Sequence, residues 1–99
     1  MGKIIVNNLD EFLILVKNSD FRISKNIVTS ILDNLKTTKK TISVLDVEVI
    51  EDGETYNVEV DKKHFVQTLE KNLLLYIKEE LYEECKDIVE AINTLKNNE

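Results

Sequence analysis

Apolar runs separated by polar breaks predict one short strand and two helices in the first part of the chain. Residues 3–6 form an apolar run typical of a strand. Asn8 is typical of a helix N-cap, and the segment 9–17 after it is apolar on nearly every side, so we expect a buried helix there. Ser24 is a second candidate N-cap, because apolar residues with helical spacing follow it. They predict a helix over 25–36 with one apolar stripe.

The residues around Asp52-Gly53 alternate between apolar and polar, which predicts an antiparallel hairpin of residues 41–51 and 54–60. An Asp-Gly pair favours the positive φ angles of a two-residue turn, and such a turn fixes the register of the two strands. The alternation breaks near residue 45, which predicts a bulge or a bend. In this register the cross-strand pairs of one face are all apolar, namely Val49 with Tyr56, Val47 with Val58 and Leu45 with Val60.

The last part of the chain, 62–96, contains no proline or glycine, and Asp61 is placed to cap a helix there. One helix of this length would span roughly 52 Å, more than a compact domain of this size, so we expect it to kink, protrude or pair. Its apolar stripe changes sides halfway along. The second stripe has near-heptad spacing, which predicts contact with the N-terminal helices or with a second copy in a homodimer. The candidate dimer-interface residues are Leu81, Cys85, Ile88, Ile92 and Leu95.

Together these elements predict a single α+β domain over residues 1–99. A small antiparallel sheet, which residues 3–6 are able to widen, packs against three helices at about 9–17, 25–36 and 62–96. A chain of 99 residues, 42% of them apolar, can form a core without disulfides or metal. The longest apolar run is too short to cross a membrane, and no signal-peptide pattern opens the chain, so we expect a cytoplasmic protein.

The residue pattern does not indicate an enzyme, a cofactor or a metal site. His64 is the only histidine, and no nucleophile motif accompanies it. Cys85 is the only cysteine and lies on the apolar stripe, where it is expected to pack as a small hydrophobe. Residues 48–59 have the glycine and glutamate of a calcium loop, but Ile50 stands where an oxygen ligand is required. We therefore expect a non-catalytic binding protein.

Charge singles out the hairpin. The net charge of −6 disfavours binding to a phosphate backbone. The stretch 41–61 contains acids and no base, so it is expected to dock on a protein partner with a basic surface, where it would steer association and occupy sites meant for phosphates. The acids of this surface are Asp46, Glu48, Glu51, Asp52, Glu54, Glu59 and Asp61.

In size and charge the chain resembles phage-encoded inhibitors of nucleic-acid enzymes, including several anti-CRISPR proteins. The abundance of lysine, isoleucine and asparagine also favours an AT-rich source, such as a low-GC bacterium or its phages. This resemblance implies an inhibitor from a phage or mobile element that acts in the host cytoplasm.

The order of the predicted elements also resembles dimeric winged-helix transcription factors. That alternative implies that the helix 25–36 reads DNA, that the hairpin is the wing and that the last helix dimerises. The acidic hairpin departs from this family, because a wing that contacts DNA prefers basic residues. The residues that would face DNA are Arg22, Ser24, Lys25, Asn26, Thr29 and Ser30, helped by Lys36, Lys39 and Lys40.

Overall fold

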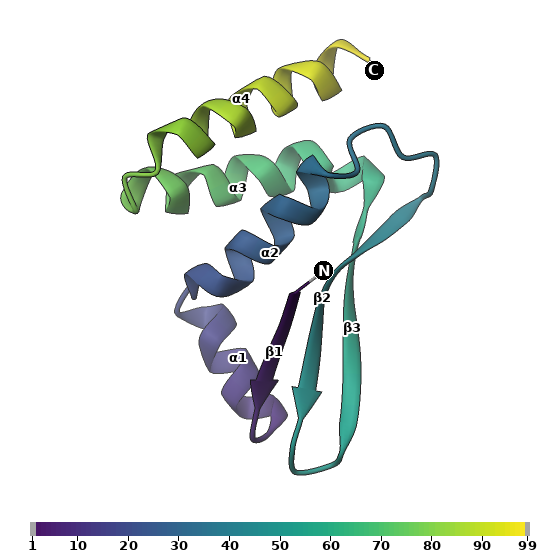
Figure 1. Ribbon diagram of the computed structural model, residues 1–99, viewed down its shortest axis with the longest axis vertical. Helices are drawn as coiled ribbons and strands as arrows, with labels where there is room; N and C mark the ends of the chain where they lie inside the picture. The colour runs from purple at the N-terminus through teal and green to yellow at the C-terminus, as the bar shows by residue number, and fades with distance from the viewer. Residues whose placement is uncertain (1, 99) are drawn as a thin grey trace.

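A computed structural model describes residues 2–98 and confirms an α+β fold (Figure 1). In chain order its elements are β1 (Gly2–Val6), α1 (Leu9–Lys17), α2 (Phe21–Leu32), β2 (Thr41–Val49), β3 (Glu54–Asp61), the 3-10 turn η1 (Lys62–His64), α3 (Phe65–Lys78) and α4 (Tyr82–Asn97).

The sheet has the strand order β1-β2-β3 and is mixed rather than antiparallel. The first strand does join the hairpin, as the sequence allows, but β1 runs parallel to β2 while β3 runs antiparallel to it. The reason is the connection between β1 and β2. Helices α1 and α2 form a long crossover that returns the chain to the start of the sheet, so the second strand repeats the direction of the first.

The hairpin closes with a four-residue loop instead of the predicted two-residue turn. Val49 pairs with Glu54, and residues 50–53 form the loop. Gly53 supplies the positive φ angle, 68°, and its amide donates to the Val49 carbonyl at 3.0 Å. From Leu45 to Val49, each residue of β2 therefore pairs with a β3 residue two positions earlier than predicted. A shift of two leaves each side chain on its predicted face, because side chains alternate with a period of two.

The bulge predicted near Leu45 is confirmed. The register of the β2–β3 ladder shifts between Ser43 and Leu45. Val44 and Leu45 are consecutive and both buried, which a regular strand does not permit, because neighbouring side chains then point to opposite faces. The bulge therefore explains the break in alternation.

Helix α2 begins four residues earlier than predicted and also ends earlier. Asp20, not Ser24, is its N-cap, and the Asp20 carboxylate accepts a hydrogen bond from the Arg22 amide at 2.9 Å. A tight turn through Ser19, whose φ is 54°, brings the chain from α1 directly to this cap. Ser24 lies instead on the buried face of α2.

The long C-terminal helix is broken into two. Glu80 has a positive φ of 58°, and around it the chain reverses, so that α3 and α4 pack as an antiparallel pair at one end of the sheet (Figure 1). This confirms the expected interruption. It also explains why the apolar stripe changes sides halfway along. Helices α3 and α4 pack against each other and against α2, so each helix buries a different side.

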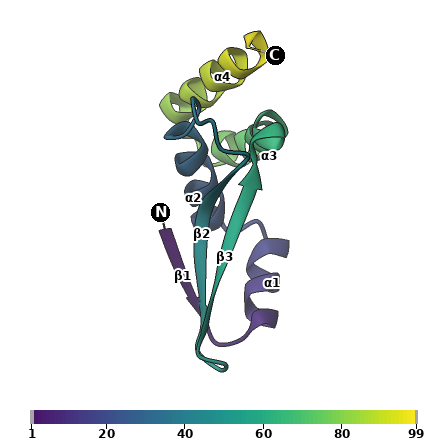
Figure 2. The same cartoon turned by 90° about the vertical axis from the view of Figure 1, so that its right-hand side faces the viewer.

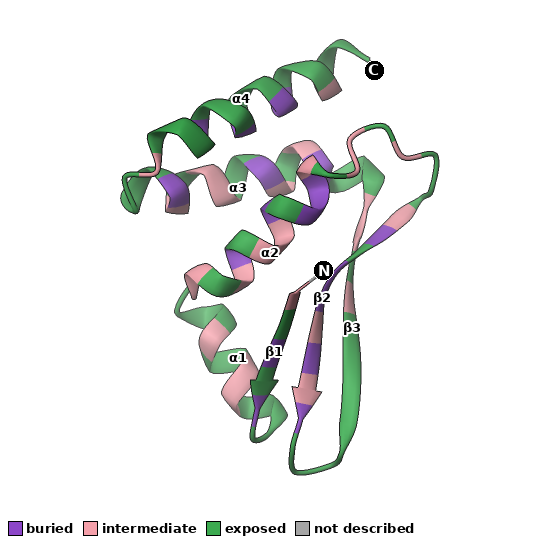
Figure 3. Cartoon of the chain, viewed as in Figure 1, coloured by how far each residue is buried: buried purple, intermediate pink, exposed green. Residues whose placement is uncertain are grey.

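The core lies between α2, the sheet and the α3–α4 pair (Figure 3). Val28 and Ile31 of α2 are buried where this helix packs on β2. Phe65 and Leu69 of α3 and Ile88 of α4 complete the core. The opposite face of the sheet carries no helix of the described chain (Figure 2). Among the described residues, no helix is both long and apolar enough to cross a membrane.

The prediction that the helix 9–17 is buried is wrong. None of the nine residues of α1 is buried, and only Phe12 and Leu15 pack against the core among its large apolar side chains. Leu13 is 61% exposed and Ile14 is 57% exposed. The helix contacts the edge strand β1, and no described element covers its outer side. Its apolar surface is therefore open.

Candidate protein-docking surface

The uncovered face of the hairpin carries a ladder of polar side chains. The Thr41 hydroxyl donates to Oε2 of Glu59 at 3.0 Å. One rung along, the Ser43 hydroxyl donates to Oδ1 of Asn57 at 2.9 Å, and the Asn57 amide donates to Oδ1 of Asp46 at 2.9 Å. These bonds cross from β2 to β3 and hold the two carboxylates in place on an exposed surface.

One cation reaches this face. Lys3 on β1 lies 3.3 Å from the Glu48 carboxylate, because the parallel register places β1 beside β2. Sequence reasoning found no base within the hairpin and did not anticipate this partner from β1. Within residues 2–98 it is the only ion pair made by the seven hairpin acids. Since both side chains are well exposed, the pair stabilises the fold by only about 0–1 kcal/mol.

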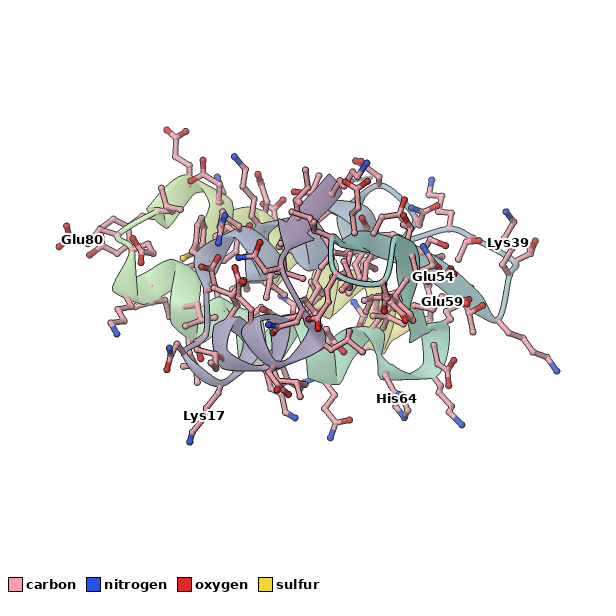
Figure 4. The ribbon with its side chains drawn as sticks, turned by 90° about the horizontal axis from the view of Figure 1, so that it is seen from below. Lys17, Lys39, Glu54, Glu59, His64 and Glu80 are labelled. Atoms are coloured by element: carbon pink, nitrogen blue, oxygen red, sulfur yellow. The ribbon has the colours of Figure 1, made fainter. Side chains whose placement is uncertain are left out.

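The hairpin tip is acidic and ordered by its own hydrogen bonds. Asp52 accepts from the Glu54 amide at 2.9 Å and from the Tyr56 hydroxyl at 2.9 Å. The hydrogen bond to Asp52, some desolvation and the nearby negative charges raise the pKa of Tyr56. Glu51 and Glu54 are exposed on either side of Asp52. Figure 4, seen from the tip, shows Glu54 and Glu59 on the hairpin.

The structure brings the seven acids to the open face and the tip. Asp46, Glu48, Glu59 and Asp61 lie on the open face, and Glu51, Asp52 and Glu54 lie at the tip. Asp61 stands at the root of the hairpin beside Lys62 and Lys63, about 23 Å from Glu54 at the rise of a β-strand. We call the six acids Asp46, Glu48, Glu51, Asp52, Glu54 and Glu59 the acidic hairpin.

Exposed apolar residues adjoin the tip, and sequence reasoning missed them. Ile50 is 61% exposed at the start of the loop. Its amide donates to the Val6 carbonyl at 3.0 Å, which places the loop beside the segment that leads into α1. On α1, Leu9, Leu13 and Val16 are exposed and lie on one stripe, because positions four and three residues apart share a helix face. The sequence did contain a signal for this exposure. The segment 9–17 is apolar on nearly every side, and such a helix has more apolar surface than one neighbouring element can cover.

This combination is typical of a protein interface. Apolar side chains provide the contact area, and charged groups around them provide specificity. Contiguous exposed apolar residues at the surface of a small domain mark interaction sites more often than chance exposure.

The five candidate dimer-interface residues lie inside the single chain. Cys85, Ile88 and Ile92 are buried, and Leu81 and Leu95 are half-buried against the core. The stripe packs mainly against α3, and it also contacts α2, which is one of the N-terminal helices predicted as its partner. A homodimer through this stripe would require α4 to leave α3.

The residues predicted to face DNA do not share one surface. Ser24 and Ser30 are buried, and the Ser30 hydroxyl donates to the Val44 carbonyl at 3.4 Å. Arg22, Lys25 and Thr29 are exposed, and Arg22 forms an ion pair with Asp20 at 3.0 Å. The face of α2 that a recognition helix would present is therefore partly used to pack on the sheet.

The remaining candidate residues show no site geometry. His64 is exposed at the end of η1 (Figure 4), and Cys85 is a buried free thiol. Among the described residues no three His, Cys, Asp or Glu side chains are grouped to hold a metal ion. Comparisons with protein-family models, with curated proteins and with solved structures found no match.

Proposed function

We propose that this chain is a non-catalytic protein-binding module that docks the acidic hairpin on the basic surface of a nucleic-acid-handling protein. The observation that carries the proposal is the run of acids along one hairpin. Three carboxylates at the tip adjoin the exposed side chain of Ile50 and the segment that leads into α1, and three more, with a single lysine partner, follow the open face of the sheet. Neither feature stabilises the fold, since like charges repel and exposed apolar groups favour aggregation.

The two features have separate roles in binding. The carboxylates steer a basic partner toward the hairpin, an effect that raises association rates by roughly 10–10³ and weakens with salt. The apolar residues Ile50 and Leu13 then supply buried area, which determines how slowly the complex dissociates.

The spacing of the carboxylates supports inhibition by competition with nucleic acid. Asp46 and Glu48 are two residues apart on one strand face, about 6.6 Å along the strand. Two nucleotides of one DNA strand rise about 6.8 Å. Lysine and arginine side chains that bind every second phosphate of a strand can therefore bind these carboxylates instead, so the bound module would block the nucleic-acid site.

The test compares three immobilised proteins in the same cell lysate. One is the wild type, one carries Glu48→Lys with Glu59→Lys, and the control carries Glu83→Lys with Glu90→Lys on the exposed side of α4. Both variants change the net charge equally and at exposed or half-exposed positions. We expect the wild type and the control to retain one basic protein that heparin releases, and the hairpin variant to lose it, as quantified by mass spectrometry.

Two outcomes would contradict the proposal. Retention of the same partner by the hairpin variant would show that the acidic hairpin does not bind it. Tight binding of random DNA fragments, with a steep dependence on salt, would favour the winged-helix alternative instead.

A further inference from the structure

A groove lies at the opposite end of the hairpin from the acidic tip. It has a volume of about 630 Å³ and is enclosed by the segment after α2, the η1 turn and the end of α4. Leu35, Val66 and Leu95 line it from three different segments of the chain, and the buried residue Phe65 lines it as well. The groove is thus apolar inside and comparable in size to small-molecule sites.

The rim of this groove is basic. Lys39, Lys40, Lys62 and Lys63 line it, with Asp61 as the only carboxylate among the lining residues. None of the four ammonium groups forms an ion pair within residues 2–98. Figure 4 labels Lys39, one lysine of this rim, on the opposite side of the view from Glu80.

The rim is held in place by the backbone. The Lys62 amide donates to the Lys40 carbonyl at 2.7 Å, which continues the β2–β3 pairing to the root of the hairpin. The Lys62 ammonium donates to the Thr37 carbonyl, and this hydrogen bond joins η1 to the segment after α2. Lys39, Lys40 and Lys63 are exposed, and their ammonium groups form no ion pair with any residue from 2 to 98.

We propose that this groove binds a small amphipathic anion. A carboxylate, sulfonate or phosphate group would contact Lys40 and Lys63 at the rim, and the apolar body would lie on Leu35, Val66 and Leu95. The net charge of −6 disfavours adsorption of anions elsewhere on the protein, so the four-to-one excess of lysine over aspartate at the rim selects this site. The site is separate from the acidic hairpin and does not depend on the function proposed for it.

The experiment uses two fluorescent probes with the same ring system. 1-Anilinonaphthalene-8-sulfonate carries a sulfonate, and N-phenyl-1-naphthylamine lacks it. We expect the sulfonate to bind at one site per chain and the neutral probe to bind more weakly. Lys40→Gln with Lys63→Gln should weaken binding of the sulfonate about tenfold, because two exposed charges are removed, and should leave the neutral probe unchanged.

The matched control is Lys17→Gln with Lys78→Gln, which removes two exposed lysines outside the groove and should leave both affinities unchanged. Urea unfolding confirms that each variant folds. Equal affinity for the two probes, or equal loss in both lysine pairs, would overturn the proposal. So would several sulfonates bound per chain, since they would indicate general adsorption to apolar surface such as α1.

Discussion

The hydroxyl of Ser24 donates a hydrogen bond of 2.6 Å to Oδ1 of Asn72, which joins α2 to α3 across 48 positions of sequence. The Asn72 amide in turn donates to the Thr68 carbonyl at 2.8 Å, so the asparagine is oriented within its own helix. Ser24 is only 2% exposed. A polar contact inside an otherwise apolar interface specifies how the two helices are aligned, because a shifted alignment would leave the hydroxyl without its partner.

Ser24→Ala removes this link. The expected loss is about 1 kcal/mol in the free energy of unfolding, since Asn72 keeps partial access to water. Urea denaturation measures it, with Thr29→Ala on the exposed side of the same helix as the control. An unchanged midpoint for Ser24→Ala would show that the hydrogen bond contributes nothing.

The ends of α1 and α3 share one geometry. At the end of α3, Leu81 donates to the Tyr76 carbonyl at 3.1 Å and Glu80 donates to the Ile77 carbonyl at 3.0 Å. These are the two bonds of a Schellman motif, in which the left-handed position is normally glycine. The end of α1 repeats it with Ser19 in the left-handed position. With no glycine or proline near either end, the break at Glu80 had no local signal in the sequence, whereas the end of α1 at Lys17 was predicted.

Replacing these two residues by glycine should stabilise the protein. Ser19→Gly and Glu80→Gly each relieve the left-handed strain of a side-chain-bearing residue, and we expect a gain of about 0.5–1 kcal/mol in the free energy of unfolding. Thermal and urea unfolding check the gain. Asp33→Gly is the control, because Asp33 ends α2 with right-handed angles, and this change should destabilise.

The hairpin shows what sequence patterns determine and what they do not. The alternation of apolar and polar residues predicted the buried face of the hairpin correctly. The adjacent apolar residues Val44 and Leu45 predicted the bulge. The loop length was wrong, because Gly53 serves a four-residue loop as well as a two-residue turn. The choice between them depends on tertiary contacts, such as the bond from the Glu51 amide to the Asn7 carbonyl at 3.0 Å, which no local pattern contains.

The hydrogen bonds of the observed loop predict how the Tyr56 hydroxyl titrates. The Tyr56 hydroxyl donates to Asp52, which raises the pKa of Tyr56 above its ordinary value of 10.0. A raised pKa means that this contribution to stability is present below pH 10 and is lost as the pH rises through the raised value. NMR of the tyrosine ring carbons measures the pKa directly. Asp52→Asn should lower it toward the ordinary value; an unchanged pKa would contradict this loop geometry.

The packing of α4 predicts how much the residues of its apolar stripe contribute to the free energy of unfolding. Ile88 is fully buried against the chain's own helices. Ile88→Ala should therefore lower the free energy of unfolding by about 2–5 kcal/mol, independently of protein concentration. Light scattering at the same concentrations measures the solution mass. A stability that rises with concentration in the wild type, and not in the variant, would indicate a homodimer through this stripe.

The candidate site was predicted only in part. The acids were evident, because a run without bases stands out in any sequence. Their apolar neighbours were not, because an apolar helix such as α1 normally lies inside a domain, and its exposure depends on its place over the edge strand β1. Lys3 likewise becomes a partner of Glu48 only through the parallel register.

The measurement that tests the docking surface most directly is site-specific photo-cross-linking in cell lysate. Benzoylphenylalanine replaces Thr55 on the open face of the hairpin in one protein and Thr94 on α4 in another; both threonines are exposed. We predict that position 55 forms a cross-link to one basic protein, that heparin prevents it, and that position 94 does not form it. Cross-links to that protein only from position 94, or none from position 55, would contradict the proposal that the acidic hairpin is the binding surface.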